Sequence, residues 1–217
     1  TENVLDERHR LTQVKVNGEI NHTYTYDAYD QVISETDAYG STTTYKINAD
    51  GRILQKTGHG ITTDYIYDAN GNCLSQTDSL KNTKVFAYDA LNRLTSETIN
   101  GAEILYVYDL RGHVTQLTDR NGNVTATTYD GEGNLLSTTA NGHTTQSVYD
   151  AVNQKITEKV DNQTIRQWAY DADGRLIKET DGLGGVTQTV YNPAGLVSKT
   201  VDPMGYATEY TYDENDN

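Results

Sequence analysis

The chain has few of the residues that build or cross-link an ordinary globular core. Its 217 residues include one cysteine, one methionine, one tryptophan, one phenylalanine and two prolines, and 35% of them are hydrophobic. Cys73 therefore has no partner for an intrachain disulfide, and we interpret it as a small hydrophobic packing residue. No apolar run reaches the length needed to span a bilayer, so we expect no membrane insertion by this segment.

Basic residues are also scarce. The chain carries 17 Lys and Arg against 31 Asp and Glu, a formal charge of −14, and its pI is about 4.6. A surface of this sign repels phosphate backbones, so nucleic acid is not an expected partner. The mean hydropathy of −0.71 is low enough to raise the alternative of disorder. The regular spacing of Tyr, Thr, Val and Ile argues against that alternative and favours a thin, evenly spread apolar layer.

The chain is rich in tyrosine, with 17 residues, and these tyrosines recur at a fixed period. A Tyr-Asp pair returns every 20 or 21 residues or a simple multiple of that, which indicates one small unit repeated many times. The signature residues are Tyr26, Asp27, Tyr67, Asp68, Tyr88, Asp89, Tyr108, Asp109, Tyr129, Asp130, Tyr149, Asp150, Tyr170, Asp171, Tyr212 and Asp213. Degenerate copies at Leu5-Asp6, Ile47-Asn48 and Tyr191-Asn192 bring the total to eleven.

Two turns divide each repeat into two β-branched and aromatic stretches, which we predict to be strands. The first turn follows Tyr-Asp and reads Asp-x-x-Gly, as in Asp68 to Gly71, with Asn replacing Gly at Asn92 and Asn153. The Asp side chain is expected to accept bonds from backbone amides two or three residues on, in a type I turn closed by a left-handed residue. We therefore interpret these Asp residues as structural and not as catalytic.

The second turn explains the alternating period. Some copies have a four-residue form such as Asp119 to Gly122, and others have the tight Asn-Gly form of Asn100-Gly101. The missing residue therefore lies in the turn, and strand register is preserved. The first copy and the copy around Asn162 keep the short turn and gain a residue after it, so we predict a small bulge in each.

A second aromatic residue stands two positions before most Tyr-Asp pairs, as at Tyr24, Phe86 and Trp168. This spacing places both aromatics on one face of a strand. We expect them to form two ladders of cross-strand contacts. The fold class predicted is all-β, with tandem hairpins of 20 to 21 residues in a continuous antiparallel ribbon that twists and curls.

The repeat unit resembles the YD repeat of the Rhs family. The closest copies are Tyr170 to Leu176, which leads to Thr180-Asp181, and Tyr88 to Leu94, and the resemblance covers essentially residues 1–217. It implies a β-ribbon that spirals into part of a hollow shell. In Rhs proteins and the similar Tc toxin components that shell encloses a C-terminal toxin, and in teneurins a similar barrel serves adhesion at the cell surface.

The expected function is therefore that of a non-catalytic segment of a secreted or cell-surface shell. Its expected partners are a C-terminal toxin cargo and the remaining shell and cap of a parent protein. The chain lacks an initial Met and shows no capping unit, so we expect a single array over 1–217 that is a fragment of a longer protein. The family's autoproteolytic cap motif is matched only in its first half, by Asp202 to Gly205, which we interpret as an ordinary repeat turn.

The residues outside the repeat signature offer no constellation for catalysis. His9, His22, His59, His113 and His143 lack metal-ligand spacing, no nucleophile elbow or nucleotide-binding loop is present, and we expect no cofactor and no metal. Calcium bound by the Asp rows stays a minor alternative. The alternative function is recognition of a glycan or a cell-surface receptor. Tyr29, Tyr39 and Tyr206 lie off the ladders, in or just after turns, and are the weak ligand-binding candidates.

Overall fold

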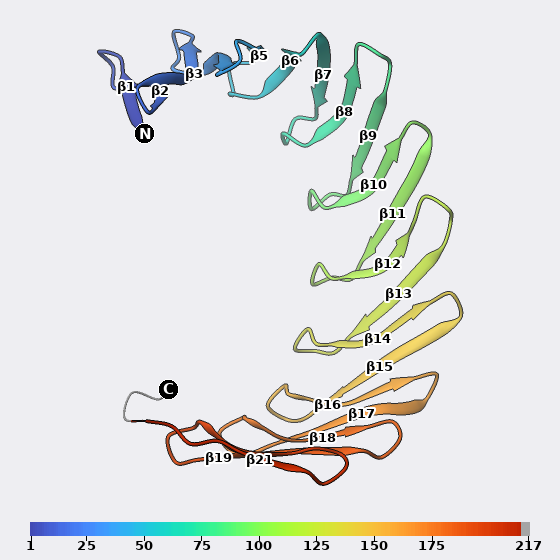
Figure 1. Cartoon of the computed structure of the whole chain (residues 1–217). Coiled ribbons are helices and arrows are strands. Elements are labelled where there is room, and N and C mark those ends of the chain that lie inside the picture. Colours follow the sequence, from blue (N-terminus) through green and yellow to red (C-terminus); the bar gives the residue numbers. More distant parts are fainter. Residues whose placement is uncertain (214–217) are drawn as a thin grey trace. The chain divides into compact units, whose positions relative to one another are not determined.

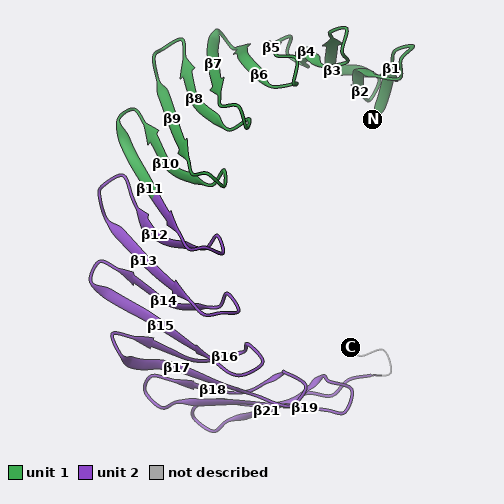
Figure 2. Cartoon of the chain, turned by 180° about the vertical axis from the view of Figure 1, so that it is seen from behind, with its two compact units in different colours: residues 1–105 green, residues 106–217 purple. Residues whose placement is uncertain are grey.

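The computed structural model describes residues 1–213, and in that range every regular element is a β-strand. The chain contains two compact units, residues 1–105 (unit 1) and 106–217 (unit 2), coloured separately in Figure 2. Residues 214–217, which follow the last Tyr-Asp pair, lie outside the described part. Within residues 1–213 no helix is long and apolar enough to cross a membrane.

Unit 1 contains the first ten strands and most of the eleventh, in chain order (Figure 1). These strands are β1 (Glu2–Leu5), β2 (Leu11–Val16), β3 (Glu19–Tyr26), β4 (Val32–Asp37), β5 (Thr42–Ile47), β6 (Ile53–Gly58), β7 (Ile61–Tyr67), β8 (Cys73–Asp78), β9 (Thr83–Tyr88), β10 (Leu94–Ile99) and β11 (Ala102–Tyr108). Each strand pairs antiparallel with the next, from β1–β2 to β10–β11.

Unit 2 repeats the same arrangement. Its strands are β12 (Val114–Thr118), β13 (Val124–Tyr129), β14 (Leu135–Ala140), β15 (His143–Tyr149), β16 (Lys155–Val160), β17 (Gln163–Tyr170), β18 (Leu176–Asp181), β19 (Val186–Tyr191), β20 (Val197–Val201) and β21 (Ala207–Glu209). Consecutive strands again pair antiparallel, from β12–β13 to β20–β21. The all-β fold of antiparallel hairpins predicted from the repeat is confirmed.

The sheet is a single layer without an interior. Among the described residues none is buried, whether apolar or polar. The accessible surface is 14402 Å², whereas a compact protein of this mass exposes about 10,000 Å². The side chains therefore form the thin, half-buried layer that the sequence predicted. Stability depends on strand pairing and on contacts between neighbouring repeats.

The two faces of the sheet differ in chemistry. The aromatic face carries the tyrosine of each Tyr-Asp pair and the residue two positions before it, such as Tyr24 and Tyr26. The hydroxyl face carries Thr and Ser, which hydrogen-bond across strands. These pairs are Thr25–Ser34, Thr36–Thr42, Thr57–Thr62, Thr128–Ser137 and Thr139–Thr144, with oxygens 2.6 to 3.0 Å apart. In β5 the hydroxyl face is exposed and the aromatic face is half-buried.

A bulge follows the Tyr-Asp turn and decides which residues reach the aromatic face. In β4, Val32 pairs with Tyr26 and Glu35 pairs with Tyr24, so Ile33 is the additional residue. Val32 and Glu35 consequently share a face although they are three residues apart, whereas a regular strand alternates every two. The same register shift recurs after the Tyr-Asp turn in both units.

The two predicted bulges after the short turns are also present. In the β2–β3 pair the register shifts between Val14 and Lys15, which leaves Asn21 as the additional residue. In the β16–β17 pair it shifts between Glu158 and Lys159, which leaves Ile165 as the additional residue. Each bulge absorbs the residue that the copy gains after its tight turn.

The hairpin turns have two forms. The tight turns have positive φ at both central residues, as a type I′ turn requires. These pairs are Asn17-Gly18, His59-Gly60, Asn100-Gly101, Asn141-Gly142 and Asp161-Asn162. The Tyr-Asp turns that the structure describes and the longer second turns have the other form, with one left-handed residue at the fourth position, such as Asn92 or Gly122.

Candidate functional site

The Asp of each Tyr-Asp pair organises its own turn. Asp89 Oδ1 accepts the amides of Leu91 at 2.9 Å and Arg93 at 3.0 Å, and its Oδ2 accepts Arg93 Nε at 2.7 Å. The accepted amides are thus two and four residues on, not two or three as predicted. The amide three residues on, that of Asn92, instead donates to the Asp89 carbonyl at 3.0 Å.

In several copies these turn bonds lower the pKa of the Asp carboxyl group. For Asp89 the largest cause is the Arg93 backbone amide, and for Asp68 and Asp130 it is the side-chain amide of the Asn four residues on. The pKa of Asp109 falls to about 2, chiefly because the His113 side chain hydrogen-bonds to it, with Nδ1 2.9 Å from Oδ2. These carboxylates are therefore ionised and already accept hydrogen bonds from their own turns, which suits a structural role and not proton transfer.

The tyrosine of each pair connects one repeat to the previous one. Its hydroxyl donates to the backbone carbonyl of the first residue of the preceding strand, with which its own strand forms a hairpin. The described bonds are Tyr26 to Leu11, Tyr67 to Ile53, Tyr88 to Cys73, Tyr129 to Val114, Tyr149 to Leu135, Tyr170 to Lys155, Tyr191 to Leu176 and Tyr212 to Val197, at 2.6 to 3.3 Å. Each tyrosine thus joins the end of its own strand to the start of the directly paired preceding strand.

This geometry corrects the expected ladders of aromatic contacts. Equivalent tyrosines are two strands apart, about 9.6 Å at the spacing of a sheet, which is too far for direct stacking. The residue four positions after Asp fills the gap. Arg10 lies 4.7 Å from the Tyr26 ring centre, Arg175 lies 4.9 Å from that of Tyr191, and the His113 ring stacks on Tyr129.

The same position also links neighbouring turns. Arg10 Nη1 lies 2.7 Å from Asp30 Oδ1, and Asn72 Nδ2 donates to Asn92 Oδ1 at 2.7 Å. In unit 2, Asn134 Nδ2 donates to Asn153 Oδ1 at 2.9 Å. Within each unit the sheet edge that carries these turns, here the Tyr-Asp edge, is therefore connected from copy to copy. The sequence pattern showed the conserved Asp and Tyr spacing but not these links, because they depend on side-chain reach.

The three turn tyrosines are all exposed. Tyr29 is 82% exposed, Tyr39 is 94% exposed and Tyr206 is 71% exposed. Tyr29 precedes β4 and Tyr39 follows it, so they lie at opposite ends of one strand, and Tyr206 belongs to unit 2. The structure therefore does not bring Tyr29 and Tyr39 into one site. Their role as ligand contacts stays a prediction.

Cys73 is half-buried at the start of β8, with Sγ 3.5 Å from the Ser75 carbonyl. His22 and His59 line the same hollow on unit 1. In the described residues no group of three or more His, Cys, Asp or Glu is placed to hold a metal ion.

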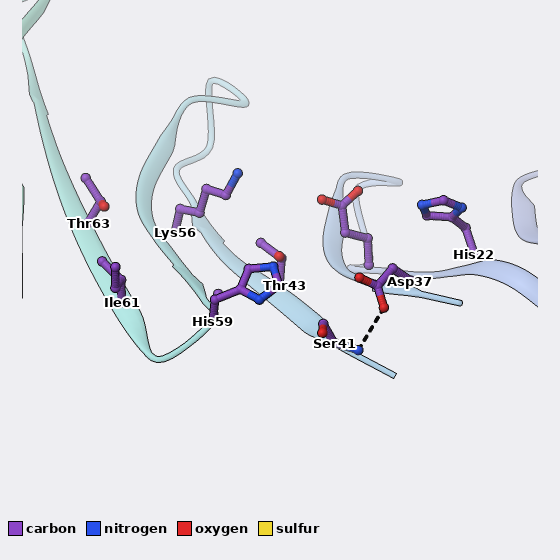
Figure 3. A pocket seen from close by; sticks show the side chains of 10 residues that line it. His22, Asp37, Ser41, Thr43, Lys56, His59, Ile61 and Thr63 are labelled. Carbon is purple, nitrogen blue, oxygen red and sulfur yellow. Dashed lines mark hydrogen bonds between the residues drawn. The ribbon is translucent and has the colours of Figure 1, made fainter. Parts of the chain in front are cut away.

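That hollow is a polar groove of about 400 Å³ on the aromatic face of unit 1, shown in Figure 3. Its lining residues come from β3 to β7 and their turns, and they are His22, Glu35, Asp37, Ser41, Thr43, Lys56, Gly58, His59, Ile61 and Thr63. Strand register creates it: Thr43 is opposite Glu35, Lys56 is opposite Thr63, and Gly58 is opposite Ile61. Because Gly58 has no side chain, the surface is hollow there.

The carboxylates of the groove already accept hydrogen bonds from neighbouring residues, and they differ in the groups that donate. Asp37 Oδ1 accepts the amides of Tyr39 and Ser41, each at 2.9 Å, and the Ser41 bond is the dashed line in Figure 3. Glu35 Oε1 accepts the Tyr45 hydroxyl at 2.6 Å. Burial, and then this bond, raises the pKa of Tyr45 to about 12, so its hydroxyl stays protonated.

Comparison with known proteins identifies the repeat. The family model described as Teneurin YD-shell matches residues 85–217, more than half of the chain, and the model described as RHS Repeat matches residues 48–83. No curated relative matches the sequence.

Solved structures with a similar fold come from Tc toxins. A mutant Tc holotoxin pore of Photorhabdus luminescens is 17% identical with a TM-score of 0.74, over 99% of this chain and 13% of that one. The TcdB2-TccC3-Cdc42 complex is 18% identical with a TM-score of 0.74, over 99% and 13%. TcdB2-TccC3 is 17% identical with a TM-score of 0.74, over 97% and 14%. The present chain thus spans about one seventh of the length of these proteins, and the likeness is one of fold.

Proposed function

Because the chain belongs to the teneurin YD-shell family, we propose that residues 1–217 act as one continuous array in the wall of a shell that encloses a toxin cargo. The array is a segment of a longer, secreted protein and has no catalytic activity of its own. Its partners are the remaining wall and cap of that protein and the cargo inside. This proposal takes the encapsulating role from the Rhs and Tc resemblance and the fold from the solved structures.

The observation that carries the proposal is the single-layer sheet. The chain exposes 14402 Å² and buries no described residue completely, so both faces of the sheet contact solvent or a neighbour. A protein that works as an isolated globule buries a core, whereas a wall needs only lateral connections between its repeats. The Tyr-Asp edge supplies such connections in both units, through tyrosine hydroxyls and turn-to-turn hydrogen bonds.

Limited proteolysis of the intact full-length protein tests the enclosure. A C-terminal epitope is followed by immunoblot while a broad-specificity protease is added, with and without prior denaturation. Enclosure predicts that the epitope survives in the native protein and is lost at once in the denatured one. Rapid loss from the native protein, while the repeats resist cleavage, would show that nothing is enclosed.

A matched variant separates enclosure from intrinsic resistance of the cargo. The isolated C-terminal segment, expressed without the repeats, is digested under the same conditions. Its rapid cleavage, together with survival in the intact protein, assigns the protection to the wall.

A further inference from the structure

Three departures from the repeat meet at the polar groove of unit 1. Lys56 occupies a position that no other copy fills with a basic residue, the equivalents being Val14, Glu35, Gln76, Glu97, Leu117, Thr138, Glu158, Glu179 and Thr200. Gly58 is the only glycine at its position, where the other tight-turn copies have Val16, Ile99, Ala140 and Val160. His59 takes the first turn position that Asn17, Asn100 and Asn141 occupy. Residues that differ from the repeat consensus are not needed to form the repeat fold. Because three of them meet in one groove, we interpret the groove as a binding site.

The groove retains both donors and acceptors for a ligand. Lys56 is exposed, its Nζ lies 5.8 Å from the Tyr45 ring centre, and it forms no ion pair with any residue in 1–213. His22 Nδ1 donates to Asn21 Oδ1 at 2.6 Å, so its Nε2 is left as an acceptor when the ring is neutral. Figure 3 shows Lys56 and His59 between His22 on one side and Thr63 on the other.

An apolar hollow adjoins the groove at Glu35. It has a volume of about 270 Å³ and is lined by Tyr24, Val32, Glu35, Tyr45 and Ile53, also on the aromatic face. The Tyr24 and His22 rings are nearly parallel, with an angle of 13° and centres 6.3 Å apart. Aromatic surface is thus continuous with the polar groups that line the groove.

We infer that the groove and the adjoining hollow together bind a saccharide of one or two sugar rings. Sugars present an apolar C–H face that fits against aromatic rings and hydroxyl groups that both donate and accept hydrogen bonds. The polar groove of about 400 Å³ lies within the usual size of small-molecule sites, roughly 300–1,000 Å³. Lys56, Thr43 and Thr63 donate to ring hydroxyls, Glu35 and His22 accept from them, and Tyr24 and Tyr45 contact the ring face.

The charges of the groove favour an uncharged sugar over an acidic one. Lys56 is its one permanent cation, and it is balanced by the carboxylates of Glu35 and Asp37. The surrounding chain is negative, with a formal charge of −14, and so repels an anion. This inference does not depend on the enclosing role proposed above, because it concerns the isolated unit 1 surface.

Three substitutions test the site with residues that the chain itself uses elsewhere. Gly58→Val fills the hollow with the residue of Val16 and Val160. Val160 lies opposite Thr145, and Thr145 is the equivalent of Thr43, the residue nearest to a Cβ at position 58. A Cβ at position 58 would come 2.8 Å from Thr43 Oγ1, so the Thr43 hydroxyl must rotate. Lys56→Gln and His59→Asn introduce the residues of Gln76 and Asn100. Lys46→Gln is the control, since Lys46 is on the hydroxyl face of the neighbouring strand.

The experiment is saturation-transfer-difference NMR of the 217-residue chain with lactose, maltose, cellobiose and di-N-acetylchitobiose, followed by titration with any sugar that gives a signal. We expect binding by at least one of them, no change for Lys46→Gln, and a loss of roughly tenfold or more for Lys56→Gln and Gly58→Val, the size of one hydrogen bond to a charged group. Circular dichroism confirms that each variant keeps its strands.

Two results would overturn the inference. One is the absence of a signal from all four sugars. The other is binding that Gly58→Val and Lys56→Gln leave unchanged, which would place the sugar elsewhere, with Tyr29→Ala, Tyr39→Ala and Tyr206→Ala then locating it among the exposed turn tyrosines. Glucuronic acid is included as a probe, and binding of that acid in preference to the neutral sugars would contradict the charge argument.

Discussion

The two edges of the sheet follow different rules. At the Tyr-Asp edge every described copy has the same turn form, and hydrogen bonds from tyrosine hydroxyls and from the residue four positions after Asp join it to its neighbours. The opposite edge carries the second turns, and there both long Asp turns and type I′ turns occur. The comparison teaches that the array needs one regular edge for its assembly, and that the other edge is free to vary and to acquire a site such as the groove beside His59.

We expect the largest difference in the free energy of unfolding when one tyrosine is removed from each edge in turn. Tyr67→Ala deletes a half-buried ring and its hydrogen bond to Ile53 O, and we expect a loss of about 2–4 kcal/mol in the free energy of unfolding. Tyr39→Ala, at the opposite edge, removes a ring that is 94% exposed and should change it by less than about 0.5 kcal/mol. Urea denaturation measures both, and equal losses would refute the distinction between the edges.

Exchanging one turn type for the other tests directly how well each edge of the sheet tolerates a change of turn. We expect replacement of residues 119–123 by Ile-Asn-Gly-Ala, the sequence of residues 99–102, to cost less than about 1 kcal/mol, because the opposite edge already accepts both forms. The same four residues in place of 130–134 remove the Asp130 acceptor and the Asn134–Asn153 link, and we expect a loss of about 2 kcal/mol.

Thermal unfolding, with hydrogen exchange of β13 and β14, compares the two exchanges. A larger loss at residues 119–123 than at 130–134 would reverse the assignment of the regular edge.

Removing a single hydroxyl sharpens the comparison within unit 2. Tyr149→Phe deletes the bond to Leu135 O, 3.1 Å long, and we expect a loss of about 1 kcal/mol. In Tyr206→Phe the hydroxyl removed belongs to a side chain that is 71% exposed, so we expect no measurable change. A double substitution should show additive effects, since the two tyrosines share no partner.

The smallest effect expected is one of pH. His113 lowers the pKa of Asp109 to about 2 in the folded chain, whereas an unfolded Asp titrates near 3.9. The folded state therefore favours the carboxylate, and its stabilisation is present above about pH 4 and is lost as the pH falls toward 2. Carbon NMR of the Asp109 carboxyl measures this directly, and titration at the ordinary value would contradict it. Asp109→Asn should weaken the pH dependence of unfolding in that window.

Much of the fold followed from local sequence signals. The spacing of Asp68 and Gly71 predicted the Tyr-Asp turn, Asn100-Gly101 predicted the type I′ turn, and the additional residue near Asn162 predicted a bulge that the structure places at Ile165. These features depend on a few adjacent residues and their φ preferences, which the sequence displays openly.

The candidate site was hidden from the sequence because it depends on register. A plain alternation of strand residues would place Val32 with Ser34, yet the bulge at Ile33 places Val32 with Glu35 on the aromatic face. His22 and His59 showed no metal-ligand spacing in the sequence, and their convergence with Lys56 requires five strands in register. The sequence signal that could have revealed the groove is the departure of Lys56, Gly58 and His59 from the residues that other repeats have at these three positions.

The sequence by itself determined the repeat, its two turns, the all-β class and the family to which the chain belongs, because each follows from spacing and turn chemistry along the chain. The tertiary structure decided where the tyrosine hydroxyls bind, which side chain lies between successive tyrosines, and which unusual residues meet in one groove. The physical reason is that strand register and bulges assign side chains to faces, and contacts between residues 15 to 40 positions apart exist only after neighbouring hairpins have paired.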